Sequence, residues 1–373
     1  MNLSVCIIAK NEEKHIEKCM QCLSNKEVQI VVADTGSTDK TKEIAKKYTE
    51  FVYDFKWVDD FGAAKQFAVS KAANDNILIL DCDEYLLSDE TVLEKLNSML
   101  ENEPQRAGRI KCINVLDDDS KNTDWITRAF NRKYYKVEGK IHEQIVKTDG
   151  EPADTFLSAV VIKHVGYALN DDEKKKKASR NIKLLKKRLA ELEKNFDSDI
   201  TQNNEKEIPY IYYQLGKSYY MEKDYNNACD FFSKGLSFDL EPKLEYVIDM
   251  VETYGYAMLN SGKVQEALSY TSIYDVFGNS ADFKFLMGLI YMKNAMFDEA
   301  VNEFQKAAEY KESRVEGTNS YLAYYNIGVI YECLGNIGKA QEYYKKCNGY
   351  SKAVERLKNG RHGNLTKCRK TGV

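Results

Sequence analysis

The sequence predicts an α/β domain with a mostly parallel sheet, followed by an all-α domain built from repeats. Short apolar runs alternate with helical patterns over residues 1–170. The composition then turns lysine-rich over residues 171–194, and a recurring pattern of small and aromatic residues starts at residue 209. A chain of 373 residues is long enough for the two or three domains that these changes indicate.

The strands of the first domain are expected at residues 3–9, 28–33 and 77–80, where apolar runs are nearly continuous and rich in β-branched residues. A further strand is expected near residues 51–55. Helical patterns occur at residues 12–23, 40–48, 62–73 and 88–100. This alternation of strands and helices predicts that most strands are parallel.

The rest of the chain divides into three predicted segments. Residues 171–208 are expected to form a charged connecting helix and a linker, since residues 197–207 have the polar composition of a loop. Residues 209–350 are predicted to form the repeat domain, and residues 351–373 a basic tail.

Four units in the repeat domain share one pattern: a glycine, an aromatic residue or methionine three positions later, and an alanine twelve positions later. The glycines of the four units are Gly216, Gly255, Gly288 and Gly328. The pattern resembles the tetratricopeptide repeat, a helix-turn-helix of about 34 residues whose small residues let two helices pack closely. The second unit departs from it at its last positions.

Charge and hydropathy exclude several partners. The chain has 54 Lys and Arg and 58 Asp and Glu, a net charge of −4, so no global basic field favours a nucleic acid. No apolar stretch approaches the roughly 18 residues of a membrane span. Because the first strand is expected to start at residue 3, we expect no signal peptide and a cytoplasmic protein.

Polar residues follow three of the predicted strands, at the sheet edge where open parallel sheets bind ligands. Asp81 and Asp83 follow the run at residues 77–80. In an extended chain both carboxylates point the same way and repel each other, unless Mg²⁺ or Mn²⁺ lies between them and an anion such as a diphosphate. The structural alternative is that they cap the next helix.

Five segments carry a resemblance to a known family: SVCIIAKNEE at residues 4–13, ADTGSTD at 33–39, DFGAAKQ at 60–66, LDCDE at 80–84 and GKIHE at 139–143. In this order they resemble the family 2 glycosyltransferases of GT-A fold. Within that family, they are similar to a branch that is often joined to tetratricopeptide repeats. The branch includes lipopolysaccharide core glycosyltransferases and bacteriocin S-glycosyltransferases.

The resemblance implies a metal-dependent, inverting transfer of a hexosyl or N-acetylhexosaminyl group from a nucleotide-diphosphosugar, with UDP as the expected nucleotide. It implies Mn²⁺ or Mg²⁺ at Asp83, with Asp81 and His164 as further ligands. The residues implied in donor binding lie at the strand ends and on one helix: Ile8, Ala9, Asn11, Asp34, Thr35, Lys65 and Asp81.

An inverting transfer requires a general base within hydrogen-bond reach of the acceptor. The predicted base is Glu143, because the family has an acidic residue in this region. His142 beside it is the alternative base, or it could orient Glu143, bind phosphate or pack. His164 is expected to be either a metal ligand or a hydrogen-bonded core residue. Arg128 and Arg132 alternate along a predicted strand and are both expected near the site.

The predicted function is therefore glycosyl transfer, with a peptide or protein as acceptor because repeat arrays present concave surfaces suited to extended chains. A cell-surface glycan or a lipid-linked saccharide is the alternative acceptor, and the repeats could equally join a homodimer. A non-catalytic scaffold with an inactive transferase domain is a second class of function. A nucleotidyltransferase is disfavoured, because residues 10–15 contain no glycine.

Overall fold

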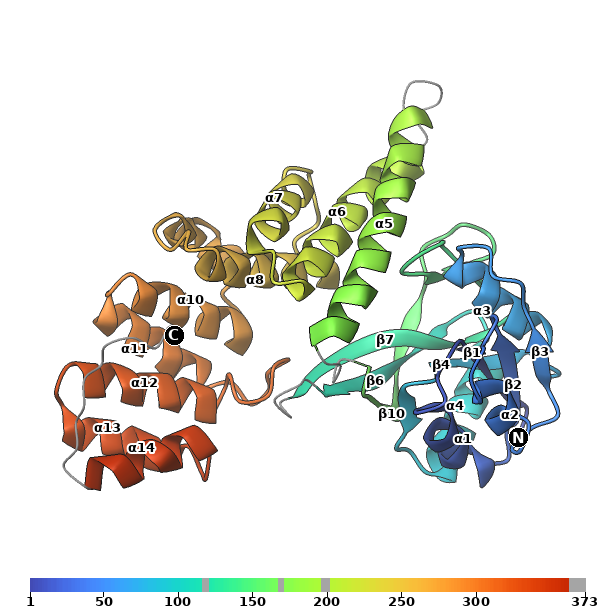
Figure 1. Cartoon of the computed structure of the whole chain (residues 1–373), viewed down its shortest axis with the longest axis horizontal. Coiled ribbons are helices and arrows are strands. Elements are labelled where there is room, and N and C mark those ends of the chain that lie inside the picture. The colour runs from blue at the N-terminus through green and yellow to red at the C-terminus, as the bar shows by residue number, and fades with distance from the viewer. Residues whose placement is uncertain (116–120, 167–170, 196–201, 362–373) are drawn as a thin grey trace. The chain divides into compact units, whose positions relative to one another are not determined.

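The computed structural model describes residues 1–115, 121–166, 171–195 and 202–361. The chain folds into two compact units, the first covering Met1–Asp172 and the second beginning at Glu173 (Figure 1).

The first unit is an α/β unit of ten strands and four helices in the described residues. Its strands are β1 (Leu3–Ala9), β2 (Gln29–Asp34), β3 (Val52–Asp54), β4 (Asn76–Asp81), β5 (Glu84–Leu86), β6 (Ala107–Val115), β7 (Lys121–Asn131), β8 (Tyr135–Glu138), β9 (Gln144–Lys147) and β10 (Thr155–His164). Its helices are α1 (Ile16–Ser24), α2 (Thr41–Ala45), α3 (Phe61–Ser70) and α4 (Glu90–Asn102).

The main sheet has eight strands in the order β3-β2-β1-β4-β7-β6-β10-β5. The strands β3, β2, β1 and β4 pair in parallel, and β6 pairs in parallel with β10. Only β7 and β5 run against their neighbours, which confirms the predicted mostly parallel sheet. β8 and β9 form a separate antiparallel pair.

Helices cover both faces of the main sheet, because its central strands are apolar on both sides. On β1, Val5 and Ile7 belong to the buried cluster that contains α1 and α4. Between them, Cys6 belongs to the cluster on the opposite face, with α3. All three side chains are at most 2% exposed, so the alternation along one strand holds the two helical layers together.

The first helix begins later than the pattern predicts, at Ile16 instead of residue 12. The carbonyl of Glu12 accepts hydrogen bonds from the N–H groups of His15 and Ile16. Asn11 has a left-handed φ of 55°. Residues 10–15 therefore turn away from the strand before the helix starts, and this turn borders the carboxyl end of β1.

The second part of the chain is helical and confirms the predicted all-α repeat domain. Its elements are α5 (Asp171–Asn195), α6 (Gln202–Met221), α7 (Tyr225–Leu236), α8 (Glu245–Asn260), the 3-10 helix η1 (Glu266–Ile273), α9 (Tyr274–Phe277), α10 (Ala281–Lys293), α11 (Phe297–Ala307), α12 (Tyr321–Cys333), α13 (Ile337–Lys346) and α14 (Ser351–Arg361). Consecutive helices pack as pairs in α6 and α7, α10 and α11, and α12 and α13 (Figure 1).

In three of the four units, the glycine lies directly against an aromatic ring of the second helix. A Cβ added at Gly216 would lie 2.5 Å from Phe232. One added at Gly288 would lie 2.6 Å from Phe304, and one added at Gly328 would lie 2.5 Å from Tyr344. The second unit differs, since Gly255 faces Leu286 and the second helix is replaced by η1 and α9. The departure seen in the sequence thus corresponds to a different local structure.

The prediction of a loop at residues 197–207 is wrong for residues 202–207, which belong to α6. Arg188 of α5 donates two hydrogen bonds to the carboxylate of Glu207, at 2.7 and 2.8 Å. This pairing, together with burial of Ile208 and Ile211, stabilises a helix over a polar stretch. Residues 197–201 lie outside the described residues.

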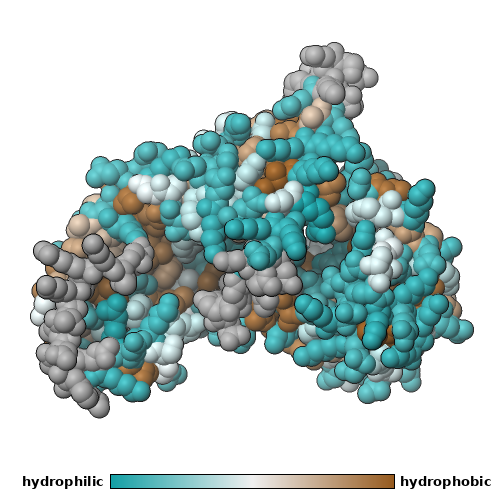
Figure 2. Space-filling view, in the orientation of Figure 1, coloured by the Kyte–Doolittle hydropathy of each residue, from teal (hydrophilic) through white to brown (hydrophobic). Residues whose placement is uncertain are grey.

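The predicted basic tail begins with a helix, α14, which packs on the preceding repeat through the buried Ala353. Residues 362–373 lie outside the described residues. In the part of the chain that the structure describes, no helix combines the length and the apolar composition needed to span a bilayer. On the face drawn in Figure 2, hydrophilic residues cover most of the surface and hydrophobic residues occur in scattered patches.

Candidate active site

Three strand ends meet at one edge of the main sheet. The parallel register pairs Ala9 of β1 with Asp34 of β2, and Ile8 of β1 with Asp81 of β4. The predicted donor-binding residues of these strands therefore lie side by side, with the two aspartates on either side of β1.

Hydrogen bonds join the loops that follow β1 and β2. The side-chain oxygen of Asn11 accepts from the N–H of Thr38 at 2.8 Å, and the N–H of Asn11 donates to the Ser37 hydroxyl at 3.0 Å. Thr35 donates twice to the carbonyl of Ala9, from its N–H at 2.8 Å and its hydroxyl at 3.1 Å. Asn11 and Thr35 thus fix the shape of this edge.

Asp34 is 3% exposed, and its two carboxylate oxygens differ in their hydrogen bonding. Its Oδ1 accepts from the N–H groups of Gly36 at 3.0 Å and Ser37 at 2.9 Å. Its Oδ2 is buried and has no hydrogen-bond partner among the described residues. A buried carboxylate oxygen without a donor is costly, so this atom favours a ligand that brings one.

A chain of alternating charges crosses the edge next to Asp81. Lys65 belongs to α3, and its Nζ lies 2.8 Å from Asp81 Oδ1 and 2.6 Å from Glu143 Oε1. Glu143 belongs to the segment between β8 and β9. Arg128 of β7 donates to Asp81 Oδ2 at 3.0 Å and to Glu84 Oε1 at 2.8 Å. Two cations thus link the three carboxylates in the order Glu84, Arg128, Asp81, Lys65, Glu143.

These contacts set the protonation of the network. Burial by itself would raise the pKa of Asp81, but Lys65 and Arg128 hold it well below its usual range. Burial lowers the pKa of Lys65, yet Asp81 and Glu143 outweigh it and leave that pKa above its ordinary value. Burial raises the pKa of Glu84, although Arg128 opposes this. At neutral pH, Asp81 is therefore ionised and Lys65 is protonated.

Local backbone contacts bring Lys65 and Glu143 together. Asp60 caps α3 by accepting from the N–H of Ala63 at 2.8 Å. The N–H of Gly62 then donates to the carbonyl of Gly139 at 3.1 Å. A Cβ at Gly62 would lie 2.6 Å from that carbonyl oxygen, so only glycine allows α3 to approach the segment that carries Glu143.

Asp83 and His164 form a second group, from the turn after β4 and the end of β10. Asp83 Oδ2 lies 3.3 Å from His164 Nε2. Gly166 lies directly over this pair: a Cβ there would be 1.9 Å from Asp83 Oδ2 and 2.6 Å from His164 Nε2. The Asp83 carboxylate and the His164 ring therefore pack directly against the backbone of Gly166, and any other residue there would displace them.

One carboxylate oxygen and one imidazole nitrogen at 3.3 Å are suitable protein ligands for a small cation. Mg²⁺ and related ions are commonly held by one or two carboxylates together with substrate phosphates. Among the described residues, no group of three or more His, Cys, Asp or Glu side chains is arranged as a metal site. The donor set therefore suits a metal that is completed by a phosphate ligand.

Two details of the predicted site are wrong. The chain is not extended through Asp81 and Asp83, because it turns at residues 82 and 83. Asp81 consequently faces Lys65 and Arg128 instead of forming a carboxylate pair with Asp83. Arg132 is not near the site: it binds Asp75, just before the opposite end of β4, because four residues of extended chain span about 13 Å.

The remaining predicted residue, His142, precedes Glu143 with a left-handed φ of 54°. Its carbonyl accepts from the Gln144 side chain at 3.0 Å. The sequence interpretation missed Gly166, whose role depends on a contact with residues far away in the chain. No local sequence signal identifies such a contact.

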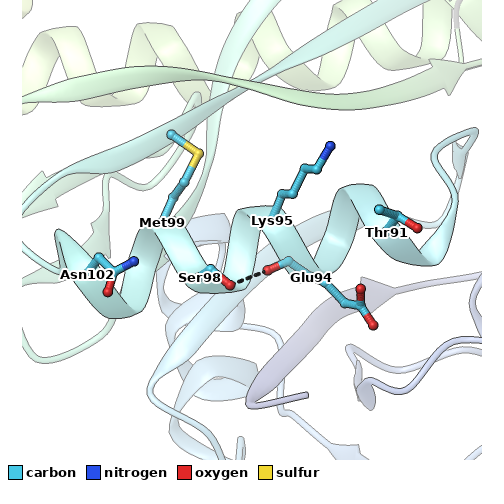
Figure 3. Close-up of a pocket in the computed structure, with 6 residues that line it drawn as sticks. All are labelled: Thr91, Glu94, Lys95, Ser98, Met99 and Asn102. Atoms are coloured by element: carbon cyan, nitrogen blue, oxygen red, sulfur yellow. Dashed lines mark hydrogen bonds between the residues drawn. The ribbon is translucent and has the colours of Figure 1, made fainter.

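A separate surface depression lies along α4 and is lined by side chains of that helix alone: Thr91, Glu94, Lys95, Ser98, Met99 and Asn102 (Figure 3). Its one internal hydrogen bond joins the Ser98 hydroxyl to the Glu94 carbonyl. It contains none of the residues described above, so we assign it no part in the site.

Comparison with known proteins shows which families the two units resemble. The family model described as glycosyl transferase family 2 matches residues 4–163. Models of the tetratricopeptide repeat match residues 210–234, 281–314 and 321–353. The two classes of model fall on different structural units.

Three curated relatives are similar to parts of the chain. A TPR repeat-containing protein of Synechococcus elongatus is 22% identical over 91% of this chain and 73% of its own length. The SPbeta prophage-derived glycosyltransferase SunS of Bacillus subtilis is 28% identical over 49% of this chain and 44% of its own length. An uncharacterized glycosyltransferase of Rickettsia typhi is 30% identical over 39% of this chain and 52% of its own length. The chain thus spans about half the length of two of these relatives.

Proposed function

The chain carries a family 2 glycosyltransferase domain followed by tetratricopeptide repeats, and from that premise we propose that it is an inverting, metal-dependent glycosyltransferase. It takes a hexosyl or N-acetylhexosaminyl group from a UDP-linked donor and transfers it to a peptide or protein side chain. Two groups of charged side chains at one sheet edge carry the proposal. One is the series of ion pairs that joins Glu84, Arg128, Asp81, Lys65 and Glu143, and the other is the Asp83–His164 pair.

The donor is proposed to lie over the ends of β1, β2 and β4. Asp34 Oδ2 is a buried acceptor without a partner in the described residues, and the imide N–H of uracil is a donor that would satisfy it. Ile8, Ala9, Asn11 and Thr35 form the surrounding edge.

A Mn²⁺ or Mg²⁺ ion held by Asp83 and His164 would supply positive charge to the donor diphosphate. Such prearranged charge is usually the largest catalytic contribution in group transfer. Lys65 stays protonated between two carboxylates and adds a fixed positive charge to the same edge. Asp81 is held by Lys65 and Arg128, and this supports a donor-binding role for it more than a metal-ligand role.

Glu143 is proposed as the general base. As the acceptor atom attacks the anomeric carbon, Glu143 takes its proton, and the bond between that carbon and the diphosphate oxygen breaks. The electron pair leaves with the diphosphate, and attack from the opposite side inverts the anomeric carbon. Lys65 holds Glu143 Oε1 at 2.6 Å and so orients the carboxylate for this step.

The repeats support a peptide or protein acceptor, because stacked helix pairs form extended concave surfaces. A glycan or lipid-linked saccharide is the alternative acceptor. A homodimer through the repeats and a cytoplasmic location stay predictions from the sequence.

The test is donor hydrolysis without acceptor, measured by mass spectrometry over UDP-hexoses and UDP-N-acetylhexosamines with Mn²⁺. We expect hydrolysis of one donor class by the wild type, and a loss of about 10²-fold or more in Asp83→Ala. Asp75→Ala, at the opposite end of β4, is the control and should keep the wild-type rate. Equal rates in wild type and Asp83→Ala would contradict the metal-dependent mechanism. No UDP-dependent or Mn²⁺-dependent thermal stabilisation would favour the inactive scaffold.

A further inference from the structure

Behind the Asp83–His164 pair, three strands hold a row of hydrogen-bonded polar side chains. Asn114 lies on β6, between β10 and β7, and the sheet register pairs it with His164 on one side and Asn122 on the other. Its side chain is 4% exposed. A buried amide with both ends engaged is a fixed element of the fold.

The partners of Asn114 determine which way its amide faces. Its Nδ2 donates to Asn122 Oδ1 at 2.7 Å and to Asp124 Oδ2 at 2.8 Å. An ionised carboxylate only accepts hydrogen bonds, so the NH₂ group must face Asp124. Asn114 Oδ1 is therefore the atom that lies 2.8 Å from His164 Nδ1.

This orientation fixes the tautomer of His164. Because Asn114 Oδ1 is an acceptor, Nδ1 of His164 must carry the hydrogen of their contact. In the neutral ring, Nε2 then presents its lone pair, and it does so 3.3 Å from Asp83 Oδ2. Two lone pairs that face each other favour a cation between them.

We propose that Asn114 and Asp124 are positioning residues that make His164 a metal ligand, an inference that rests on the metal-dependent function proposed above. Asp124 orients Asn114, Asn114 places the proton on His164 Nδ1, and His164 Nε2 joins Asp83 beneath Gly166. Such outer partners of a metal-binding histidine typically contribute a factor of 10 to 100 in metal affinity.

The experiment measures Mn²⁺ binding to the full chain by electron paramagnetic resonance, without donor or acceptor. We expect Asn114→Leu to weaken Mn²⁺ binding about tenfold or more. The double variant N114D/D124N exchanges the two groups: the new carboxylate accepts from His164, and the new amide donates to it. This exchange should restore most of the affinity.

Two controls separate positioning from general damage to the sheet. Asn131→Leu removes another buried amide of β7, which binds Asn76 at the opposite end of the sheet, and should leave Mn²⁺ affinity unchanged. Nitrogen-15 spectra of the chain, which has four histidines, should show the Nδ1–H tautomer at His164 in the wild type and its loss in Asn114→Leu.

The outcomes distinguish this inference from the proposed function. If Asn114→Leu binds Mn²⁺ as tightly as the wild type while Asp83→Ala does not, the positioning role is overturned and the metal site stands. An equal loss in Asn131→Leu, or a folded double variant without recovered affinity, also overturns it. If Asp83→Ala retains wild-type affinity, both the metal site and this inference fail.

Discussion

Lys65 is the residue on which the candidate active site depends most. It is 3% exposed, and its ammonium lies between the carboxylates of Asp81 and Glu143. Removing it would leave the carboxylates of Asp81 and Glu143 near each other without the cation between them, which is unfavourable because like charges repel. One residue thus couples the proposed donor-binding aspartate to the proposed base.

We therefore expect Lys65→Met to reduce glycosyl transfer by about 10²-fold or more. Lys65→Arg keeps the charge and should retain more of the rate, although the guanidinium does not match the ammonium in shape. The measurement is steady-state transfer or donor hydrolysis in folded protein. Lys71→Met, at the end of the same helix, is the control, and wild-type activity in Lys65→Met would show that the ion pairs are dispensable.

In the repeats, Glu252 of α8 is a carboxyl group in an unfavourable environment. Its side chain is 4% exposed, and burial raises its pKa from 4.5 to about 7, although Arg314 pairs with it. Neighbouring Asp249 pairs with both Arg314 and Lys217, and these cations hold its pKa well below its usual range. The shared arginine thus stabilises one carboxylate more than the other.

The raised pKa of Glu252 gives a prediction with a definite sign. The folded state holds this proton more tightly than the unfolded state, so the associated stability is complete below pH 4.5 and is lost as the pH rises to about 7. The loss is on the order of 3 kcal/mol. Glu252→Gln should remove this pH dependence, which thermal unfolding at pH 5 and pH 8 would measure.

The control for that experiment is Glu299→Gln on the exposed face of α11. It should unfold with the same pH dependence as the wild type. A wild-type pH dependence in Glu252→Gln would mean that Arg314 fully compensates the buried carboxylate.

At the scale of helices and strands, close approach through glycine recurs in both units. Gly62 lets α3 approach the segment before β9, and Gly328 lets α12 approach α13. In each case the added Cβ would lie 2.5 to 2.6 Å from an atom of the neighbouring element. Helix packing in the repeats therefore depends on the missing side chain at this position.

We expect Gly328→Ala to destabilise the repeats by about 1 to 3 kcal/mol, because Tyr344 must move to admit the methyl group. Gly338→Ala is the matched control in α13. Its nearest neighbouring atom is the Asn336 side-chain oxygen at 4.0 Å, so alanine should be neutral or stabilising there. Thermal unfolding of the two variants would measure the difference, and equal stability would contradict the packing explanation.

At the scale of the whole molecule, we assign the proposed chemistry and the proposed acceptor binding to different units. The proposed donor, metal and base residues all lie within residues 8–164 of the first unit. The repeats are the part proposed to bind the acceptor.

We predict that a chain truncated after residue 172 keeps UDP-sugar hydrolysis but loses transfer to its peptide or protein acceptor. Mass spectrometry of both products in one assay would measure the two activities. Full transfer by the truncated chain would assign acceptor binding to the first unit. Loss of hydrolysis in a folded truncated chain would show that the first unit needs the repeats for its chemistry.

Local pattern alone predicted the order of the first four strands and the four helices of the first unit, the repeats, and the strand ends that carry polar residues. These follow from short-range periodicity, because a strand buried on both faces must be apolar and a helix pair must have small residues where it packs. The start of α6 was predicted wrongly, because its polar first turns are stabilised by Arg188 of another helix.

Only the tertiary structure decided which charged groups meet. Lys65 and Glu143, Arg128 and Asp81, and His164 and Asn114 are each far apart in the sequence and are joined by sheet register and loop contacts. The turn at residues 82 and 83 likewise separated Asp81 from Asp83, which an extended strand would have paired. The residue types of the sequence determined which chemical groups were available. The tertiary structure determined which of these groups could act together, because Coulomb and hydrogen-bond interactions depend on distance in space.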